Sequence, residues 1–323
     1  MRYGLPYMGS KNKIAELIVN KLPRADNLYD LFCGGCAITH CALLQNKYNN
    51  YYINDIQQGQ AQFFLDCING KYKDETRWIS REEFKEKHRV DPYIACVWSF
   101  GNKGYTYLYG EDIEESKRLM WNAIMLDDFE PLEKYIGFTI KDSVKQIKDK
   151  HKRRIAIKKD IKKIAELHPE LTKLEPLDRL PSLERLQSMQ SLERLTQKKI
   201  IASCKSYDEV EIKPNSVIYC DIPYQDTQMY LTNGGGNSKR ECNTFDYEKF
   251  YEWCSKQTEL VVISSYEIKD SRLIEVWNIE KTCSLSATNN AKKSIERLYV
   301  PVHQLELWKK YNEKYTQTTI FDI

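Results

Sequence analysis

The chain lacks both a long apolar run and a strong net charge. Within its 323 residues no apolar stretch reaches the length of a membrane span, and the start, Met1-Arg2-Tyr3-Gly4, has no signal-peptide core. The net charge of +3 is too small to indicate a nucleic-acid partner by itself. We therefore expect a soluble, cytoplasmic globular protein whose function has to be found in particular residues.

The chain also lacks a regular cysteine pattern. Its ten cysteines are irregularly spaced and accompany no secretory signal, so we expect reduced thiols rather than disulfides. Cys33-Gly34-Gly35-Cys36, with His40 and Cys41 nearby, permits a zinc or redox interpretation. A structural zinc site needs a second ligand pair at suitable spacing, and the sequence offers none. We expect no metal, and the two glycines are the more informative part of this segment.

A full dinucleotide-binding fingerprint is absent, although its outline is present. Leu28 to Phe32 is typical of a short buried strand that runs into the Gly34-Gly35 turn and a helix. A second strand, Tyr51 to Ile53, leads to Asp55, which is the plan of a nucleotide-binding half of a doubly wound sheet. Because the G-x-G-x-x-G turn that holds a pyrophosphate is missing, a cofactor without phosphates fits better, and S-adenosylmethionine is one.

The most informative segment is Asp221-Ile222-Pro223-Tyr224, which follows the apolar run Val217 to Cys220. A buried strand that stops there would present a carboxylate, a stiffened backbone and a ring at one place. Asp221 and a backbone carbonyl can accept hydrogen bonds from the amine of a flat ring, on which Tyr224 can stack. An ordinary strand-to-loop turn is the alternative, since Asp and Pro are common turn residues.

The middle of the chain interrupts the strand–helix pattern. Residues 71–204 carry helical signals, such as the capping box of Ser80 and Glu83, without regular strands. Residues 172–197 include a near-repeat that we interpret as a low-complexity spacer. Strands resume after Ser216, with further candidates in residues 260–263, 273–279 and 298–302. The sequence thus predicts an α/β domain of residues 1–70 and 205–308, a mainly helical insertion at 71–204, and a tail at 309–323.

Several short segments together carry a resemblance to a known family. They are Tyr7-Met8-Gly9-Ser10-Lys11, Asp30-Leu31-Phe32-Cys33-Gly34-Gly35-Cys36, Asn54-Asp55, Ser99-Phe100-Gly101-Asn102, Tyr107-Leu108-Tyr109-Gly110, Asp221-Ile222-Pro223-Tyr224 and Phe245-Asp246-Tyr247. With these segments the chain resembles the Dam-type DNA adenine-N6 methyltransferases over nearly its whole length. Cys36 departs from the family pattern, which usually has glycine there, and Ile222 replaces the first proline of a D-P-P-Y motif.

The resemblance implies a Rossmann-like methyltransferase sheet, mostly parallel with a terminal antiparallel strand, and an inserted DNA-recognition region. It implies methyl transfer from S-adenosylmethionine to the N6 amine of an adenine flipped out of double-stranded DNA. The implied catalytic residues are Asp221, Ile222, Pro223 and Tyr224. The implied cofactor-binding residues are Tyr7, Lys11, Phe32, Gly34, Gly35, Asp55 and Asp221. For Tyr7 and Lys11 the alternatives are a packing residue before a helix and a solvated charge.

Candidate DNA contacts lie mainly in the insertion. Positive charge is concentrated from Lys141 to Lys163, with eleven Lys/Arg against three Asp, although a solvated helix face has the same composition. A loop that combines amide, cation and aromatic groups suits base reading or wedging between bases. The expected DNA-binding residues are Asn102, Lys103, Tyr105, Tyr107, Lys152, Arg153, Arg154, Lys239 and Arg240.

The C-terminal tail has the pattern of a short docking peptide. Gln317 to Phe321 resembles short peptides by which bacterial replication proteins dock on the sliding clamp. We expect a monomer in the cytoplasm of a bacterium or of a phage-infected cell.

A methyltransferase for protein glutamine or ribosomal RNA is disfavoured because 185 residues separate Gly35 from Asp221. Cytosine-N4 methylation and a catalytically impaired DNA-binding relative remain open.

Overall fold

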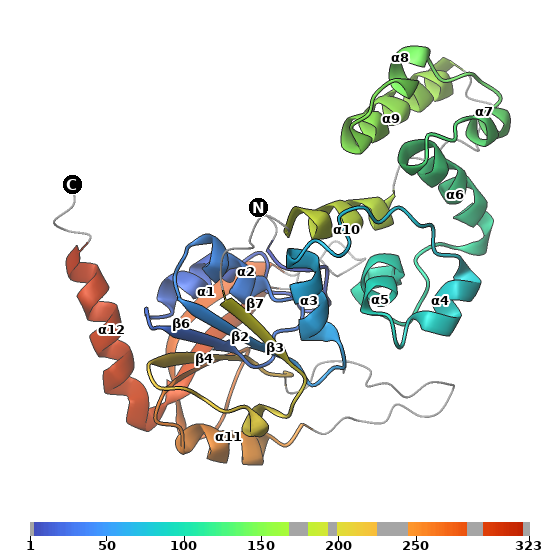
Figure 1. Ribbon diagram of the computed structural model, residues 1–323. Helices are drawn as coiled ribbons and strands as arrows, with labels where there is room; N and C mark the ends of the chain where they lie inside the picture. The colour runs from blue at the N-terminus through green and yellow to red at the C-terminus, as the bar shows by residue number, and fades with distance from the viewer. Residues whose placement is uncertain (1–2, 168–179, 193–198, 225–244, 283–292, 319–323) are drawn as a thin grey trace. The chain divides into compact units, whose positions relative to one another are not determined.

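The computed structural model describes residues 3–167, 180–192, 199–224, 245–282 and 293–318. The predicted DNA contacts Lys239 and Arg240 lie outside these ranges, as do residues 319–321 of the segment expected to bind the sliding clamp; these remain predictions. The chain divides into two compact units. We call Met1–Gly70 with Leu192–Ile323 the sheet unit, and Lys71–Ser191 the helical unit (Figure 1).

The sheet unit is built on seven strands in the order β3-β2-β1-β4-β5-β7-β6. Only β7 is reversed, pairing antiparallel with both β5 and β6, while the other pairs are parallel. The predicted mostly parallel, Rossmann-like sheet with a reversed last strand is confirmed. The strands are β1 (Asn27–Asp30), β2 (Asn50–Asn54), β3 (Lys199–Ser203), β4 (Ser216–Asp221), β5 (Leu260–Ser265), β6 (Leu273–Thr282) and β7 (Lys293–Pro301).

Helices cover both faces of this sheet, which explains why β1, β4 and β5 read as continuous buried runs. On one face Tyr29 and Ile218 pack with Phe250 of α11. On the other face α2 lies over β1 and β2, where Thr39 bonds Asp30 and the Tyr51 hydroxyl donates to Ala42 O. The helices are α1 (Ala15–Lys21), α2 (Ala37–Leu44), α3 (Gln60–Ile68), α11 (Tyr247–Ser255) and α12 (Leu305–Thr318), with 3-10 turns at Tyr207–Glu209 and Val302–Gln304.

The helical unit is inserted in the connection between β2 and β3. It follows α3 and ends at Ser191, whereas the sequence placed the end of the insertion at 204. The difference is β3, a short edge strand of the sheet that pairs parallel with β2 and was missed. Its burial pattern is irregular and only partial, so it gives little periodic signal.

The described residues of the helical unit form helices around an aromatic core. Trp98 and Trp121 are fully buried, and Trp78 packs edge-on against Trp98 with ring centroids 4.8 Å apart. Ser80 begins the first helix by accepting from Glu83 N, as its motif predicts. The helices are α4 (Arg81–Lys87), α5 (Pro92–Trp98), η1 (Phe100–Asn102), α6 (Glu111–Met125), α7 (Glu130–Ile136), α8 (Asp142–Lys145), α9 (Lys150–Leu167) and α10 (Pro181–Gln190).

No helix in the described ranges is long and apolar enough to cross a membrane.

The feature that positions a site is the reversal of strand order in the sheet. From β1 the chain builds outward through β2 to β3, and then returns to the other side of β1 for β4. Ligands of open α/β sheets bind at the carboxyl ends of the strands beside such a reversal. The carboxyl ends of β1, β2 and β4 carry the glycine turn, Asp55 and Asp221.

Candidate active site

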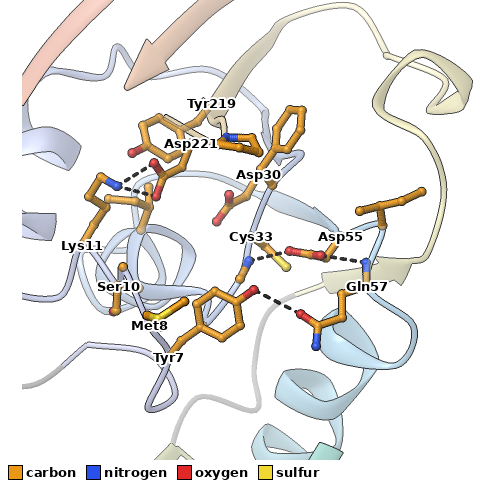
Figure 2. A pocket seen from close by; sticks show the side chains of 18 of the residues that line it. Tyr7, Met8, Ser10, Lys11, Asp30, Cys33, Asp55, Gln57, Tyr219 and Asp221 are labelled. Atoms are coloured by element: carbon orange, nitrogen blue, oxygen red, sulfur yellow. Dashed lines mark hydrogen bonds and ion pairs between the residues drawn. The ribbon is translucent and has the colours of Figure 1, made fainter. Parts of the chain in front are cut away.

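A cavity of about 450 Å³ lies at these three strand ends. This volume is within the usual range for small-molecule sites. Its walls come from four segments that are far apart in the sequence: residues 7–11, 30–38, 55–58 and 219–223. Figure 2 shows the side chains of these segments converging on one space. The structure therefore brings together the predicted cofactor residues and the Asp221 motif.

The glycine turn leaves no room for a side chain at its floor. Gly34 has φ +45°, and a Cβ there would lie 2.8 Å from the Tyr7 ring. A Cβ on Gly35 would lie 2.6 Å from Leu5 O, because the N-terminal segment crosses the turn and Leu5 N donates to Gly35 O. The Tyr7 hydroxyl also donates to Gln57 Oε1 at 3.1 Å (Figure 2). Tyr7 is thus a wall of the cavity as well as a packing residue on the turn.

Cys36 occupies a position whose backbone favours glycine. Its φ of 55° and ψ of 34° are left-handed, and the residue precedes α2. Only glycine adopts this conformation without strain, which accounts for the glycine usual in the related family. The thiol is buried and hydrogen-bonded to that of Cys33, and burial raises the pKa of both thiols. Unreactive, protonated thiols are expected from these surroundings.

Asp55 lines the cavity just after the end of β2. Its Oδ2 accepts from Gly34 N at 2.8 Å and its Oδ1 from Gln57 N at 2.9 Å. Burial raises the pKa of this carboxyl, against the opposing effect of the two backbone donors. Each oxygen keeps acceptor capacity beyond its backbone bond, as the hydroxyls of a ribose require.

Asp30 is a buried carboxyl at the end of β1 that we did not single out from the sequence. It lines the cavity, is 2% exposed, and accepts a hydrogen bond from Thr39 Oγ1 at 2.7 Å. Burial raises its pKa to about 7, and the nearby charges of Asp221 and Asp55 act in the same direction. A ligand with a positive charge would reverse this effect by stabilising the ionised form.

Asp221 forms a close ion pair with Lys11. Lys11 Nζ lies 2.5 Å from Oδ1 and 2.6 Å from Oδ2, joining residues 210 positions apart in the sequence (Figure 2). The Lys11 side chain is 4% exposed and that of Asp221 22%. Lys11 therefore both lines the cavity and contacts Asp221, the predicted catalytic acid. The ammonium stabilises the negative charge that Asp221 needs as a hydrogen-bond acceptor.

The other residues of the Asp221 motif are fixed by core packing and by hydrogen bonds to side chains of α11 and β7. Ile222 is 2% exposed and packs in the core under α11, which a proline of the family pattern would fill less. The Tyr247 hydroxyl donates to Pro223 O at 2.9 Å. Tyr224 is half-buried; its ring lies 4.3 Å from that of Tyr266, and its hydroxyl donates to Glu296 Oε1 at 2.6 Å. Stacking of Tyr224 on a base remains a prediction.

Phe32 takes part in an aromatic cluster beside the cavity. Its ring centroid lies 5.7 Å from each of those of Tyr207, Phe245 and Phe250. The ring is only partly buried, and Phe32 also lines the cavity. Both expectations for Phe32, core packing and a place in the site, therefore apply to the same side chain.

The predicted DNA-reading loop is a hairpin between Ser99 and Tyr107 in the helical unit. Its turn has left-handed conformations at Gly101 and Asn102, with Lys103 exposed and Tyr105 43% exposed. Tyr107 corrects the sequence prediction, because it is 7% exposed and its hydroxyl donates to Ile79 O at 2.8 Å. Phe100, 61% exposed, is instead the second exposed aromatic ring of this hairpin, beside Tyr105.

The basic segment also contains a correction. Arg153 is 2% exposed and donates to Ile147 O at 2.7 Å and to Ile124 O at 2.8 Å, so it holds the helical unit together and is not free to contact phosphates. Arg154 pairs with Glu184 at 2.8 Å. Lys152 is exposed, on the side of α9 that points away from the buried stripe of Arg153, Ile157 and Ile161. The exposed lysines of that side include Lys152, Lys159, Lys162 and Lys163, which we call the lysine face.

Sequence reasoning missed Asp30, Gln57 and Glu296. Asp30 had a usable signal, since it ends one buried strand just as Asp221 ends another. Glu296 also had one, because it is the single acid of a strand that continues as the apolar run Leu298 to Val300. Gln57 had none. Among the described residues no group of three or more His, Cys, Asp or Glu side chains could hold a metal ion.

Comparison with known proteins agrees with the geometry. A protein-family model described as D12 class N6 adenine-specific DNA methyltransferase matches residues 7–136. That range contains the N-terminal segment, the glycine turn, Asp55 and the hairpin with its exposed aromatic rings. A search of curated proteins found no match. Residues 7–136 are thus similar to the Dam-like D12 class of methyltransferases, and this match indicates an adenine-specific DNA methyltransferase.

Proposed function

We propose that the enzyme transfers the methyl group of S-adenosylmethionine to the N6 amine of an adenine flipped out of double-stranded DNA. One observation carries this proposal: Asp221, braced by Lys11, ends β4 at the same cavity as the glycine turn and Asp55. The Asp221 motif lies outside residues 7–136, so its role rests on this geometry rather than on the family match.

The charges of the cavity support S-adenosylmethionine as cofactor. Asp30, Asp55 and Asp221 line it, and Lys11 is the only cation among its described lining residues. Because Lys11 is already paired, these residues provide no site for a phosphate, whereas three carboxyls suit a cationic ligand. Asp55 would accept from ribose hydroxyls, and the bare backbone of Gly34 and Gly35 would allow close approach. When bound, S-adenosylmethionine supplies a methyl group on a sulfonium centre.

The residues of the Asp221 motif would orient the amine. An adenine N6 amine is a weak nucleophile because its lone pair is delocalised into the ring. Hydrogen bonds donated to Asp221 and to the backbone carbonyl of Ile222 would direct this lone pair out of the conjugated system. Lys11 bonds both oxygens of Asp221, but a carboxylate has about four acceptor positions, so capacity for the amine remains. Positioning of two reactants can lower a barrier by about 7–11 kcal/mol.

Base flipping follows from the location of the motif in a cavity. An amine inside a paired duplex cannot reach Asp221, and enzymes that modify bases extrude the target nucleotide into a pocket. Tyr224 follows Asp221 by three positions. Its ring can stack on the extruded adenine if the base enters beside Tyr266.

Two surfaces of the helical unit are suited to DNA. The lysine face of α9 can neutralise phosphates, a contribution that does not depend on sequence and weakens with salt. The hairpin presents Phe100, Lys103 and Tyr105, which combine exposed rings with a cation. Such rings can wedge between bases, and the cation can reach a base edge or phosphate.

Labelled methyl transfer to unmethylated DNA tests the proposal. Asp221→Ala should abolish transfer of the labelled methyl group in a protein that remains folded at the assay temperature, and Asp74→Ala, at an exposed carboxylate, should keep full activity. Nuclease digestion of the product should yield N6-methyladenine. A full-rate, folded Asp221→Ala enzyme would refute the mechanism. An inactive wild-type protein that still binds DNA would instead identify an impaired relative.

Sequencing that detects modified bases in DNA from cells expressing the protein extends the same test. It should report methylated adenines in one short sequence context in the wild type and none with Asp221→Ala. Methylated cytosine in its place would identify a cytosine-N4 enzyme.

A further inference from the structure

Glu296 is a fully buried carboxylate in the middle of β7. Its sequence neighbours Ile295 and Arg297 are only half-buried, and Arg297 pairs with Glu275 rather than with Glu296. A buried charge is costly unless it has strong partners. The partners of Glu296 are therefore the reason to ask what it does.

Three side chains from three other segments converge on one atom, Glu296 Oε1. The Tyr224 hydroxyl and Ser264 Oγ each donate to it at 2.6 Å. Lys11 Nζ lies 3.9 Å from the same oxygen. A distance of 2.6 Å is typical of a hydroxyl bound to a charged oxygen, which is roughly twice as strong as a neutral pair.

Two of these partners are also the groups that would hold the target base. Tyr224 would stack on the adenine, and Lys11 braces the carboxylate of Asp221 at 2.5 Å. Lys11 Nζ lies in addition 4.8 Å from the centroid of the Tyr224 ring. The ammonium therefore sits between two carboxylates and against the tyrosine, and one side of this arrangement is fixed by Glu296.

We propose that Glu296 is a positioning residue for methyl transfer, which fixes Tyr224 through its hydroxyl and holds Lys11 against Asp221. This inference rests on the proposed function of Asp221 and Tyr224. It assigns the hydroxyl of Tyr224 a task separate from its ring: the ring contacts the base, and the hydroxyl anchors the ring to the sheet through β7. Ser264 completes the arrangement by occupying a further acceptor position of the same oxygen.

A purely structural role would predict a different outcome from a positioning role. If Glu296 only filled space, its isosteric amide would keep both packing and activity. If it orients the base-holding groups, loss of its charge weakens two contacts that meet the reacting amine. Among the predicted cofactor-binding residues Glu296 approaches Lys11, at 3.9 Å, whereas Asp55 and Gly34 bond each other on a different segment, so the affinity for S-adenosylmethionine should change less than the rate of methyl transfer.

The test compares Glu296→Gln, Tyr224→Phe and the double variant with wild type in labelled methyl transfer to unmethylated DNA. Each single variant should lower kcat about 10-fold or more, since a misplacement of ~1 Å can cost as much as 10²-fold. KM for S-adenosylmethionine should change much less than kcat, and each variant should remain folded at the assay temperature. Because both changes remove the same contact, the double variant should lose clearly less than the product of the two single losses.

Two controls make the result decisive. Glu252→Gln, at an exposed carboxylate of α11 paired with Lys256, should keep the wild-type kcat. Asp221→Ala separates the two proposals. If it is inactive while Glu296→Gln and Tyr224→Phe keep full kcat, or if their losses multiply independently, the positioning role of Glu296 is overturned alone. If Asp221→Ala is active, the proposed function and this inference fall together.

Discussion

The two units of the enzyme use charged residues in opposite ways. In the sheet unit the charged groups expected to act in the site, Lys11, Asp55 and Asp221, all face one cavity. In the helical unit Arg153, expected to contact phosphates, is buried and bonds backbone carbonyls, while Lys152 beside it is exposed.

The difference shows which sequence patterns predict where a side chain lies in the folded protein. A residue at the carboxyl end of a parallel strand has a defined place, because neighbouring strands end at the same edge of the sheet. A run of basic residues on a helix lacks this information. Successive side chains turn by about 100° around the helix axis, so the run contributes to the core and to the surface alike. Four predictions test the comparison.

The largest expected effect concerns Arg153. Arg153→Ala should lower the free energy of unfolding by about 3 kcal/mol, because two charge-assisted hydrogen bonds to buried carbonyls are lost. Lys152→Ala, at the adjacent exposed position, should change it by less than about 0.5 kcal/mol. Chemical denaturation followed by circular dichroism measures both. A stable Arg153→Ala protein whose DNA binding has become less sensitive to salt would restore the sequence interpretation of Arg153 as a phosphate ligand.

The next effect concerns Asp30, whose folded pKa is about 7. As pH rises from the unfolded pKa of about 4 toward 7, the unfolded chain releases a proton that the folded protein keeps, so stability falls across this window. Asp30→Asn removes the ionisable group and should be more stable than wild type at pH 8, by about 2 kcal/mol once the lost hydrogen bond from Thr39 is set against the removed penalty, and close to wild type at pH 4. Denaturation at the two pH values measures this.

The same Asp30 variant should bind S-adenosylmethionine more weakly at pH 8, which calorimetry measures. Asp74→Asn, at an exposed carboxyl, should leave both quantities at wild-type values. Equal stability of Asp30→Asn and wild type at all pH values would contradict the burial of an ionisable group at the cavity.

The third effect concerns the lysine face. The triple variant Lys152→Ala, Lys159→Ala, Lys163→Ala should bind DNA more weakly and lower the slope of log K against log salt by up to about 2.7, or about 0.9 per phosphate contact. Titrations at several salt concentrations measure the slope. Three exposed lysines of the sheet unit, Lys21, Lys269 and Lys310, provide the matched control variant. An unchanged slope in the first variant would make the lysine face a solvated surface only.

The smallest effect concerns Cys36. In an ordinary helix alanine is more stable than glycine, but the left-handed backbone of Cys36 reverses the order. Cys36→Gly should exceed Cys36→Ala in free energy of unfolding by about 1 kcal/mol. Both variants lose the same buried thiol contacts, so their difference in thermal or chemical denaturation isolates the backbone. An advantage of alanine would show that the turn relaxes to another conformation.

The sequence predicted the parts of the molecule that depend on local pattern and chain order. The strands that end at Asp30 and Asp221, the glycine turn between β1 and α2, and the helical interruption after α3 all have periodic or compositional signals. What could not be predicted depends on tertiary contacts. No local pattern distinguishes the inward Tyr107 from the outward Tyr105, or indicates that Lys11 would meet Asp221 across 210 positions.

The insertion of the helical unit between β2 and β3 also sets an order of folding. β1 pairs with β4, whose first residue lies 189 positions beyond the first residue of β1, so these contacts form only after a long loop has closed. During synthesis the helices of residues 71–191 leave the ribosome before β3 and β4, and their contacts with one another can form first. Until β4 pairs with β1, one edge of β1 has unpaired backbone groups. The partly formed sheet is therefore the folding intermediate most prone to aggregate.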